Sequence, residues 1–167
     1  MLTIGTYVIH EKYGICLVKE IQKNMKVGTK RNDYFVLKPV YNPSSSVYIP
    51  LTNKTAEEKL KALPTAEEIL KLLESGNKLE WLEDGKTRSD LFEKILSDGD
   101  RKKILEMIKC IEEKKKELAE QAKKLRIADE TALKTAEKII SEEFSFILGI
   151  PKENVGEYIR RIYYKNT

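Results

Sequence analysis

The sequence predicts an α+β protein in which a small N-terminal β-barrel of the SH3 or Tudor type precedes a compact all-α domain. Two observations support this prediction. Short β-branched and aromatic runs separated by turn residues fill residues 1–51. From Thr55 onward, apolar residues instead recur every three or four positions, as they do along one face of a helix. We therefore expect two domains, residues 1–54 and residues 55–167.

The N-terminal segment contains four apolar runs that are typical of strands. They span residues 7–9, 16–18, 34–37 and 47–49. Turn residues lie between them, among them Gly14, Gly28 and the Asn-Pro-Ser-Ser-Ser stretch at 42–46. An open sheet of this size would expose its edges and one apolar face. We therefore expect the strands to close into a barrel.

Helix starts in the second domain are indicated by capping residues. Thr55 and Thr65 each precede a glutamate by three residues, which fits a capping box and predicts two helices. Gly76 and Asn77 are predicted to end the second of these helices.

Three further helices and a short C-terminal one are predicted from the same kind of signal. One helix spans about residues 87–96, and Asp100 caps a long helix whose apolar positions run to Leu125. Asp129 is predicted to cap the next helix, which Gly149 closes. The last helix follows Pro151. Short connections between these helices predict antiparallel packing.

Composition restricts the chemistry that the chain can perform. Its cysteines are Cys16 and Cys110, and its single histidine is His10, so neither a zinc site nor a histidine-based catalytic triad is predicted. The sequence also lacks a GxxxxGK[ST] phosphate loop and a GxGxxG fingerprint. We therefore expect a binding protein without cofactor or metal, not an enzyme.

Charge and hydropathy point to an acidic partner in an aqueous compartment. The formal net charge is +4, and residues 1–54 alone carry eight basic and three acidic residues. A basic segment of this kind favours an acidic protein surface or a nucleic acid. No window approaches the roughly 18 consecutive apolar residues that a membrane span needs, and residues 1–5 lack a signal-peptide pattern. We expect a cytoplasmic protein with no membrane partner.

Several stretches, in their order and spacing, resemble the CarD/CdnL/TRCF family. They are residues 4–9 (IGTYVI), 13–21 (YGICLVKEI), 33–38 (DYFVLK), 47–50 (VYIP) and 92–100 (FEKILSDGD). The similarity extends to a tryptophan near the middle of the chain and an arginine soon after it. The resemblance implies a bacterial transcription regulator whose barrel docks on the β subunit of RNA polymerase. It also implies that the helical domain contacts promoter DNA at the upstream edge of the bubble and stabilises the open complex.

The resemblance assigns the polymerase-facing residues by position. They are Lys23, Asn24, Met25, Val47, Tyr48 and Ile49. An exposed strand edge pairs with another chain through backbone hydrogen bonds, which constrain sequence little. This chain has Asn24 and Tyr48 at positions where relatives can carry arginine.

The candidates for DNA contact lie in the helical domain. They are Trp81, Lys86, Arg88, Arg101, Lys102 and Lys103. Two interpretations of Trp81 stay open: a wedge inserted at a base step, as the resemblance implies, or a core side chain. Nothing in the sequence is positioned for major-groove readout, so weak sequence specificity is expected. We expect a monomer that is nucleoid-associated through the polymerase.

Other functional classes remain as alternatives. Glu80, Glu83 and Asp84 surround Trp81 and favour a protein interaction adaptor that uses the same barrel but does not bind DNA. The basic N-terminal segment favours an RNA-binding barrel, although no platform of aromatic residues and arginines is evident. A carboxylate hydrolase is the alternative among enzymes.

Overall fold

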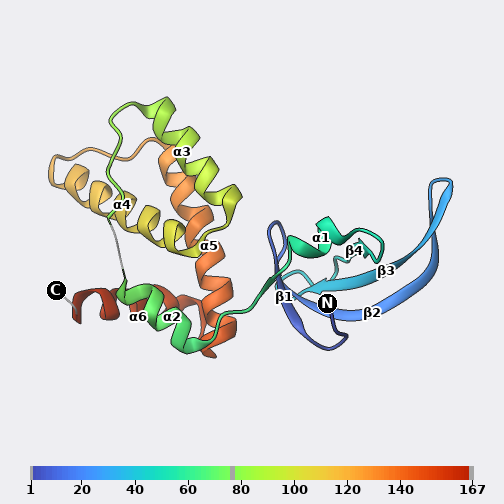
Figure 1. The fold of residues 1–167 in the computed structure, drawn as a ribbon. Helices are drawn as coiled ribbons and strands as arrows, with labels where there is room; N and C mark the ends of the chain where they lie inside the picture. Colours follow the sequence, from blue (N-terminus) through green and yellow to red (C-terminus); the bar gives the residue numbers. More distant parts are fainter. Residues whose placement is uncertain (1, 76–77, 166–167) are drawn as a thin grey trace. The chain divides into compact units, whose positions relative to one another are not determined.

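The computed structural model describes residues 2–75 and 78–165, and it divides the chain into two compact units. The N-terminal unit is Met1–Pro64 and the helical unit is Thr65–Thr167. A sheet dominates the first unit and helices make up the second (Figure 1). The α+β prediction is therefore confirmed.

The N-terminal unit contains one antiparallel sheet with strand order β4-β3-β2-β1-β5. Its elements are β1 (Tyr7–His10), β2 (Gly14–Val27), β3 (Lys30–Pro39), β4 (Val47–Pro50), the short helix α1 (Lys54–Glu58) and β5 (Lys61–Ala62). The two longest strands, β2 and β3, form a hairpin that extends beyond the other strands (Figure 1). In the described residues, β4 and β5 form the two edges of the sheet.

The core of this unit follows from the two-residue period of the strands. One face of the sheet collects buried side chains from four strands, namely Val8, Cys16, Val18, Phe35, Leu37, Val47 and Ile49. Each of these side chains removes apolar surface from water, which is the main source of stability in a unit of this size.

Residues 55–64 belong to the N-terminal unit in the structure, whereas the sequence predicts a boundary after residue 54. The reason is that this segment makes tertiary contacts with the N-terminal unit. β5 pairs with β1, joining Val8 to Ala62 and Ile9 to Lys61. Leu60 also packs against the core of the sheet.

The predicted capping box at Thr55 is wrong. Helix α1 begins at Lys54, and the side chain of Asn53 caps it by accepting a hydrogen bond from the N–H of Ala56 at 3.1 Å. Asparagine is as good a cap as threonine. Thr55 therefore lies inside the helix.

The helical unit packs four helices against α5. The elements are α2 (Ala66–Glu74), α3 (Gly85–Asp98), α4 (Arg101–Glu120), α5 (Ile127–Leu148) and α6 (Lys152–Lys165). Helices α2, α3, α4 and α6 each contact α5. The predicted stripe of α5 is buried at Leu133, Ala136, Ile140 and Phe144.

Several predicted caps in the helical unit are confirmed, and one there is wrong. Thr65 and Glu68 form the reciprocal capping box of α2, and Asp100 caps α4. Gly149 ends α5 in the left-handed conformation, with φ of 66°. Asp129 is not a cap, because α5 begins two residues earlier and the carboxylate of Asp129 accepts a hydrogen bond from Arg88. The prediction for Gly76 and Asn77 falls outside the described residues.

The long helix α4 ends at Glu120, before the predicted limit at Leu125. Ala122 adopts φ of 54°. The N–H of Lys123 donates to the C=O of Leu118, and the N–H of Ala122 donates to the C=O of Ala119. This is the hydrogen-bond pattern of a Schellman motif, in which Ala122 takes the position that is usually glycine.

Candidate functional site

The outer edge of β4 offers backbone groups for pairing with another chain, and we call this the docking edge. The N–H of Leu51 donates to the C=O of Asp33 at 2.9 Å, so these two residues form a hydrogen-bonded pair of the β3–β4 ladder. Val36 lies opposite Tyr48 in the same register. Because hydrogen-bonded and non-bonded pairs alternate, Tyr48 directs its N–H and its C=O away from β3. Pro50 also faces outward but has no N–H, so Tyr48 supplies the donor that β4 presents there.

The side chains of β4 divide between the core and the surface. Val47 and Ile49 are buried in the core of the N-terminal unit and hold the strand in place. Tyr48 is 42% exposed, and its ring lies edge-on to Tyr34 with 6.4 Å between centroids. Of the three predicted residues in this strand, only Tyr48 exposes its side chain.

The other predicted polymerase-facing residues lie at an irregularity in β2. The register with β3 shifts between Gln22 and Met25. Asn24 has φ of 55°, a conformation that asparagine tolerates better than most residues. Its N–H donates to the carboxylate of Asp33 at 2.8 Å. A bulge of this kind increases the local twist of the strand, and Lys23 is exposed beside it.

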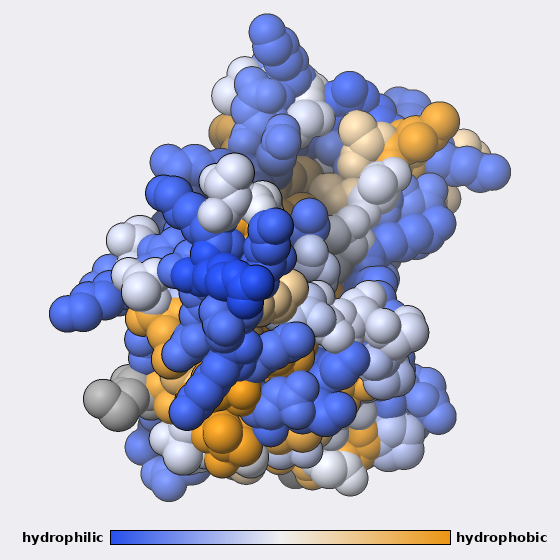
Figure 2. Space-filling view, turned by 90° about the vertical axis from the view of Figure 1, so that its right-hand side faces the viewer, coloured by the Kyte–Doolittle hydropathy of each residue, from blue (hydrophilic) through white to orange (hydrophobic). Residues whose placement is uncertain are grey.

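The hairpin beyond this bulge is basic and solvent-exposed. Its exposed basic side chains are Lys23, Lys26, Lys30 and Arg31. More generally, hydrophilic residues cover most of the face shown in Figure 2, with hydrophobic patches between them. The N-terminal unit therefore combines an open strand edge with positive charge, which suits an acidic protein surface.

In the helical unit, Trp81 lies in the segment between α2 and α3 and is half-buried. Its ring packs edge-on against Phe92, with 6.4 Å between ring centroids. The guanidinium carbon of Arg88 lies 4.1 Å from the centroid of the indole, and Nζ of Lys114 lies 5.7 Å from it. Trp81 is thus anchored to the core by packing and by two cation–π contacts. The rest of its surface stays accessible.

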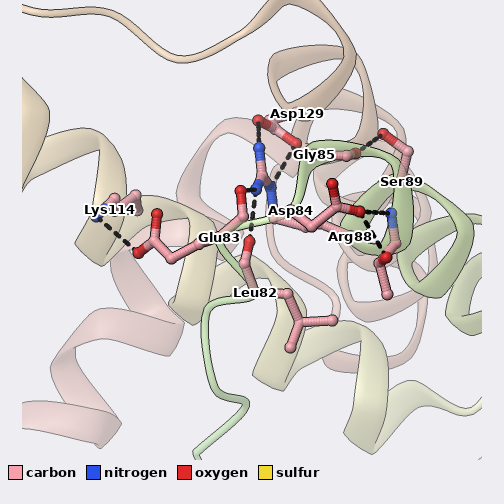
Figure 3. Close-up of polar contacts among 9 residues, drawn as sticks. Leu82, Glu83, Asp84, Gly85, Arg88, Ser89, Lys114 and Asp129 are labelled. Atoms are coloured by element: carbon pink, nitrogen blue, oxygen red, sulfur yellow. Dashed lines mark hydrogen bonds and ion pairs between the residues drawn. The ribbon is translucent and has the colours of Figure 1, made fainter.

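Arg88 and Asp129 form a buried ion pair that organises this segment (Figure 3). Nε and Nη2 of Arg88 donate to the two carboxylate oxygens of Asp129 at 3.0 and 2.7 Å. Nη1 donates to the carbonyls of Leu82 and Glu83 at 2.5 and 3.2 Å. The hydrogen bonds to Asp129 raise the pKa of Arg88 above its ordinary value. The guanidinium is committed to contacts within the protein, so Arg88 positions the Trp81 segment.

Two of the acidic residues near Trp81, Asp84 and Glu83, are also engaged. Asp84 caps α3, accepting hydrogen bonds from the N–H and the hydroxyl of Thr87 at 2.9 and 2.6 Å. These hydrogen bonds lower the pKa of the Asp84 carboxyl. Glu83 lies 3.8 Å from Nζ of Lys114 (Figure 3). These contacts offset part of the negative charge around the indole.

The remaining candidate cations lie at opposite ends of α3. Lys86 is exposed in its first turn, close in sequence to Trp81. Arg101, Lys102 and Lys103 begin α4, beyond the far end of α3. A helix of this length spans about 20 Å, so the two groups would meet separate phosphates. Arg101 is paired with the buried Glu143, whereas Lys103 is exposed.

The sequence contains a signal for the buried pair that the cap prediction missed. Asp129 continues the apolar stripe of α5 four residues before Leu133. Arg88 likewise precedes the buried Phe92 and Ile95 at helical spacing. A charged residue on a buried stripe indicates a partner elsewhere in the core. The identity of that partner is not local information, because 41 residues separate the two.

Residues 2–75 and 78–165 contain no group of three or more histidine, cysteine, aspartate or glutamate side chains that could hold a metal ion. Cys16 and Cys110 are buried free thiols. Burial raises the pKa of Cys16 to about 11, so its thiol is protonated at neutral pH.

Within the described part of the chain, none of the helices combines the length and the apolar character that crossing a membrane requires.

Comparison with known families identifies the N-terminal unit. Residues 2–56 match the family model of the CarD-like/TRCF RID domain. No curated protein matches the chain. The match covers the bulge in β2 and the whole of β4, and it stops before the helical unit. The RID domains of this family are non-enzymatic RNA polymerase-binding domains. Residues 2–56 of this chain are therefore a CarD-like/TRCF RID domain, which supports an RNA polymerase-interacting protein related to transcription.

Proposed function

We propose that this protein regulates transcription by docking on the β subunit of RNA polymerase through its N-terminal unit and contacting promoter DNA through its helical unit. The DNA contact lies near the upstream edge of the bubble and stabilises the open complex. The observation that carries this proposal is the RID match, because it covers the strand with an open backbone edge. The DNA-contacting half of the proposal rests on the surface of the helical unit.

Docking would proceed by strand addition at β4. An incoming strand of the polymerase pairs with the outward N–H and C=O of Tyr48, and backbone pairing tolerates sequence change. The exposed Tyr48 ring adds contact area. Lys23 and the other basic side chains of the hairpin would meet acidic residues of the polymerase.

DNA contact would be made by the accessible part of the Trp81 indole and by lysines of α3 and α4. Lys86 lies in the first turn of α3, close in sequence to Trp81, and Lys102 and Lys103 would provide a second point of contact beyond the far end of that helix, about 20 Å along it. Arg88 acts as a positioning residue that fixes the indole, and Arg101 is held by Glu143. Lysine contacts to phosphates carry no sequence information, so sequence specificity is weak.

The two contacts would reinforce each other through the chain that joins them. Docking on the polymerase raises the effective concentration of promoter DNA near the helical unit. A modest intrinsic affinity for DNA is then sufficient. The protein would act on the lifetime of the open complex. It would not need to bind DNA tightly on its own.

The docking edge is tested by comparing Tyr48→Pro with Tyr48→Ala. Both substitutions remove the phenol ring, but only proline removes the outward N–H of residue 48. Proline is tolerated at such a position because the donor is not used in the sheet. We expect Tyr48→Pro to weaken polymerase binding clearly more than Tyr48→Ala, measured by biolayer interferometry with the purified enzyme. Equal affinities of the two variants would exclude pairing at this residue.

The adaptor function is the second candidate, and one observation favours it. Glu80 and Glu83 are exposed beside Trp81, and carboxylates repel phosphates. An adaptor would bind polymerase through the same edge and a second protein through the helical unit. Salt-dependent binding of fork-junction promoter DNA separates the two functions, because it is expected only of the DNA-contacting regulator.

A further inference from the structure

The helical unit contains an apolar groove that neither candidate surface uses. Its volume is about 880 Å³, and residues of α4, α5 and α6 line it. Helices α4 and α6 both pack on α5. Leu133 and Ile140 of α5 are buried in its floor, and the half-buried Ile108 and Ile159 line it from α4 and α6. We call this feature the α4–α6 groove.

The charges around the groove are strongly unequal. Among the described residues, seven basic and three acidic side chains line it, an excess of four positive charges. One of the acidic residues, Glu112 of α4, lies 4.0 Å from Arg160 of α6. Lys115, Lys116 and Lys138 are exposed around the groove. An apolar floor with a positive rim is complementary to a ligand that is apolar on one side and acidic at its margins.

Gly156 lies on the wall of the groove and is a second feature that suggests an occupant. Glycine in the interior of a helix is less favourable than alanine, so a packing reason is expected. A Cβ placed on Gly156 would meet only Nη2 of Arg160, at an ordinary contact distance of 3.8 Å. The unit's own packing therefore does not require a glycine. Its missing side chain leaves room for the backbone of another element to approach α6.

We propose that the α4–α6 groove binds an acidic amphipathic helix of a partner protein. Such a helix would place apolar residues at i, i+3, i+4 and i+7 on the floor and its carboxylates against the lysines of the rim. The groove follows α4 from Leu105 to Ala119, which is about 20 Å and matches a helix of about four turns. The inference is independent of polymerase docking and of DNA contact, since the residues proposed for those contacts do not line the groove.

The test uses the full chain and a fluorescein-labelled synthetic peptide of about 15 residues, long enough to fill the groove. The peptide carries leucines at helical spacing and glutamates elsewhere. A peptide of the same composition with dispersed leucines is the control. Fluorescence anisotropy is expected to show at least about tenfold tighter binding of the amphipathic peptide, a difference well above measurement error. Equal affinity of the two peptides would overturn the proposal.

Two sets of variants locate the binding. Gly156→Leu fills the groove while improving helix propensity, so it should keep the fold and lower peptide affinity about tenfold. Lys116→Glu with Lys138→Glu should also weaken binding, whereas Lys71→Glu with Lys94→Glu, outside the groove, should not. Unchanged affinity of Gly156→Leu would contradict the proposal. Concentration-dependent self-association that Gly156→Leu abolishes would also contradict it, because the occupant would then be a second copy.

Discussion

The Arg88–Asp129 pair joins α3, the start of α5 and the segment that carries Trp81. Both side chains are almost fully buried, at 3% and 1% exposure, and no hydrogen-bonding atom of either side chain is left without a partner. A buried ion pair gains little over an apolar pair, but the loss of one member leaves an uncompensated charge. The pair therefore matters most for stability because the loss of one member would leave the other as an unpaired buried charge.

We expect Asp129→Ala to lower the free energy of unfolding of the helical unit by about 3–5 kcal/mol. Trp81 is the single tryptophan of the chain, so its fluorescence in a urea titration reports this unit. Replacing both partners, as in Arg88→Met with Asp129→Leu, should recover much of the loss because no charge stays buried alone.

The matched control is Lys71→Ala, which breaks the exposed Glu67–Lys71 pair of α2. An exposed pair four residues apart on a helix contributes about 0.3–0.5 kcal/mol. If Asp129→Ala proved no more destabilising than Lys71→Ala, the buried pair would not have the organising role assigned to it.

At the scale of elements, the Schellman motif that ends α4 carries a residue poorly suited to it. Ala122 occupies the left-handed conformation at φ of 54°, and Gly149, the residue that follows α5, occupies the same conformation at φ of 66°. A side chain is strained there. The two helix ends therefore form a natural pair for comparison.

We expect Ala122→Gly to stabilise the helical unit by about 0.5–1 kcal/mol and Gly149→Ala to destabilise it by roughly 1 kcal/mol. No atom lies within 4 Å of a Cβ built on Gly149, so backbone strain alone accounts for the second effect. Thermal unfolding followed by circular dichroism measures both. Shifts of the same sign for the two variants would contradict the assignment of strain to these positions.

Local chemistry explains which elements can be predicted from the sequence. The capping box of Thr65, the cap at Asp100 and the stripe of α5 depend on residues a few positions apart, and each is confirmed. The end of α4 was missed because Ala122 gives no glycine signal. The start of α5 was missed because Arg126 caps it without a side-chain hydrogen bond.

The candidate sites were predictable to different degrees. The strands of the docking edge follow from composition, but the outward direction of the Tyr48 backbone depends on the register with β3. Arg88 is a basic residue near Trp81, as a DNA contact would be, and only the structure identifies the buried partner that holds it. Periodicity alone would have placed Arg88 and Asp129 on buried stripes.

At the scale of the whole molecule, the two units have separate cores and separate proposed contacts. The DNA contact of the helical unit is electrostatic in the proposed account, so each lysine that meets a phosphate adds to the salt dependence of binding. Lys86→Ala and Lys102→Ala should each reduce the slope of log affinity against log salt by about 1.

Fluorescence anisotropy with fork-junction DNA at several salt concentrations measures these slopes. Lys71→Ala, on the exposed face of α2, should leave the slope unchanged. Slopes that none of the substitutions alters would indicate that DNA is not held by these lysines, and they would favour the adaptor function.

The dissociation rate of open promoter complexes, with and without the protein, tests the central claim most directly. The account predicts slower dissociation with the unaltered chain, a smaller effect with Tyr48→Ala and little effect with Tyr48→Pro at the same concentration. An unchanged dissociation rate, despite demonstrated binding of the chain to polymerase, would contradict stabilisation of the open complex.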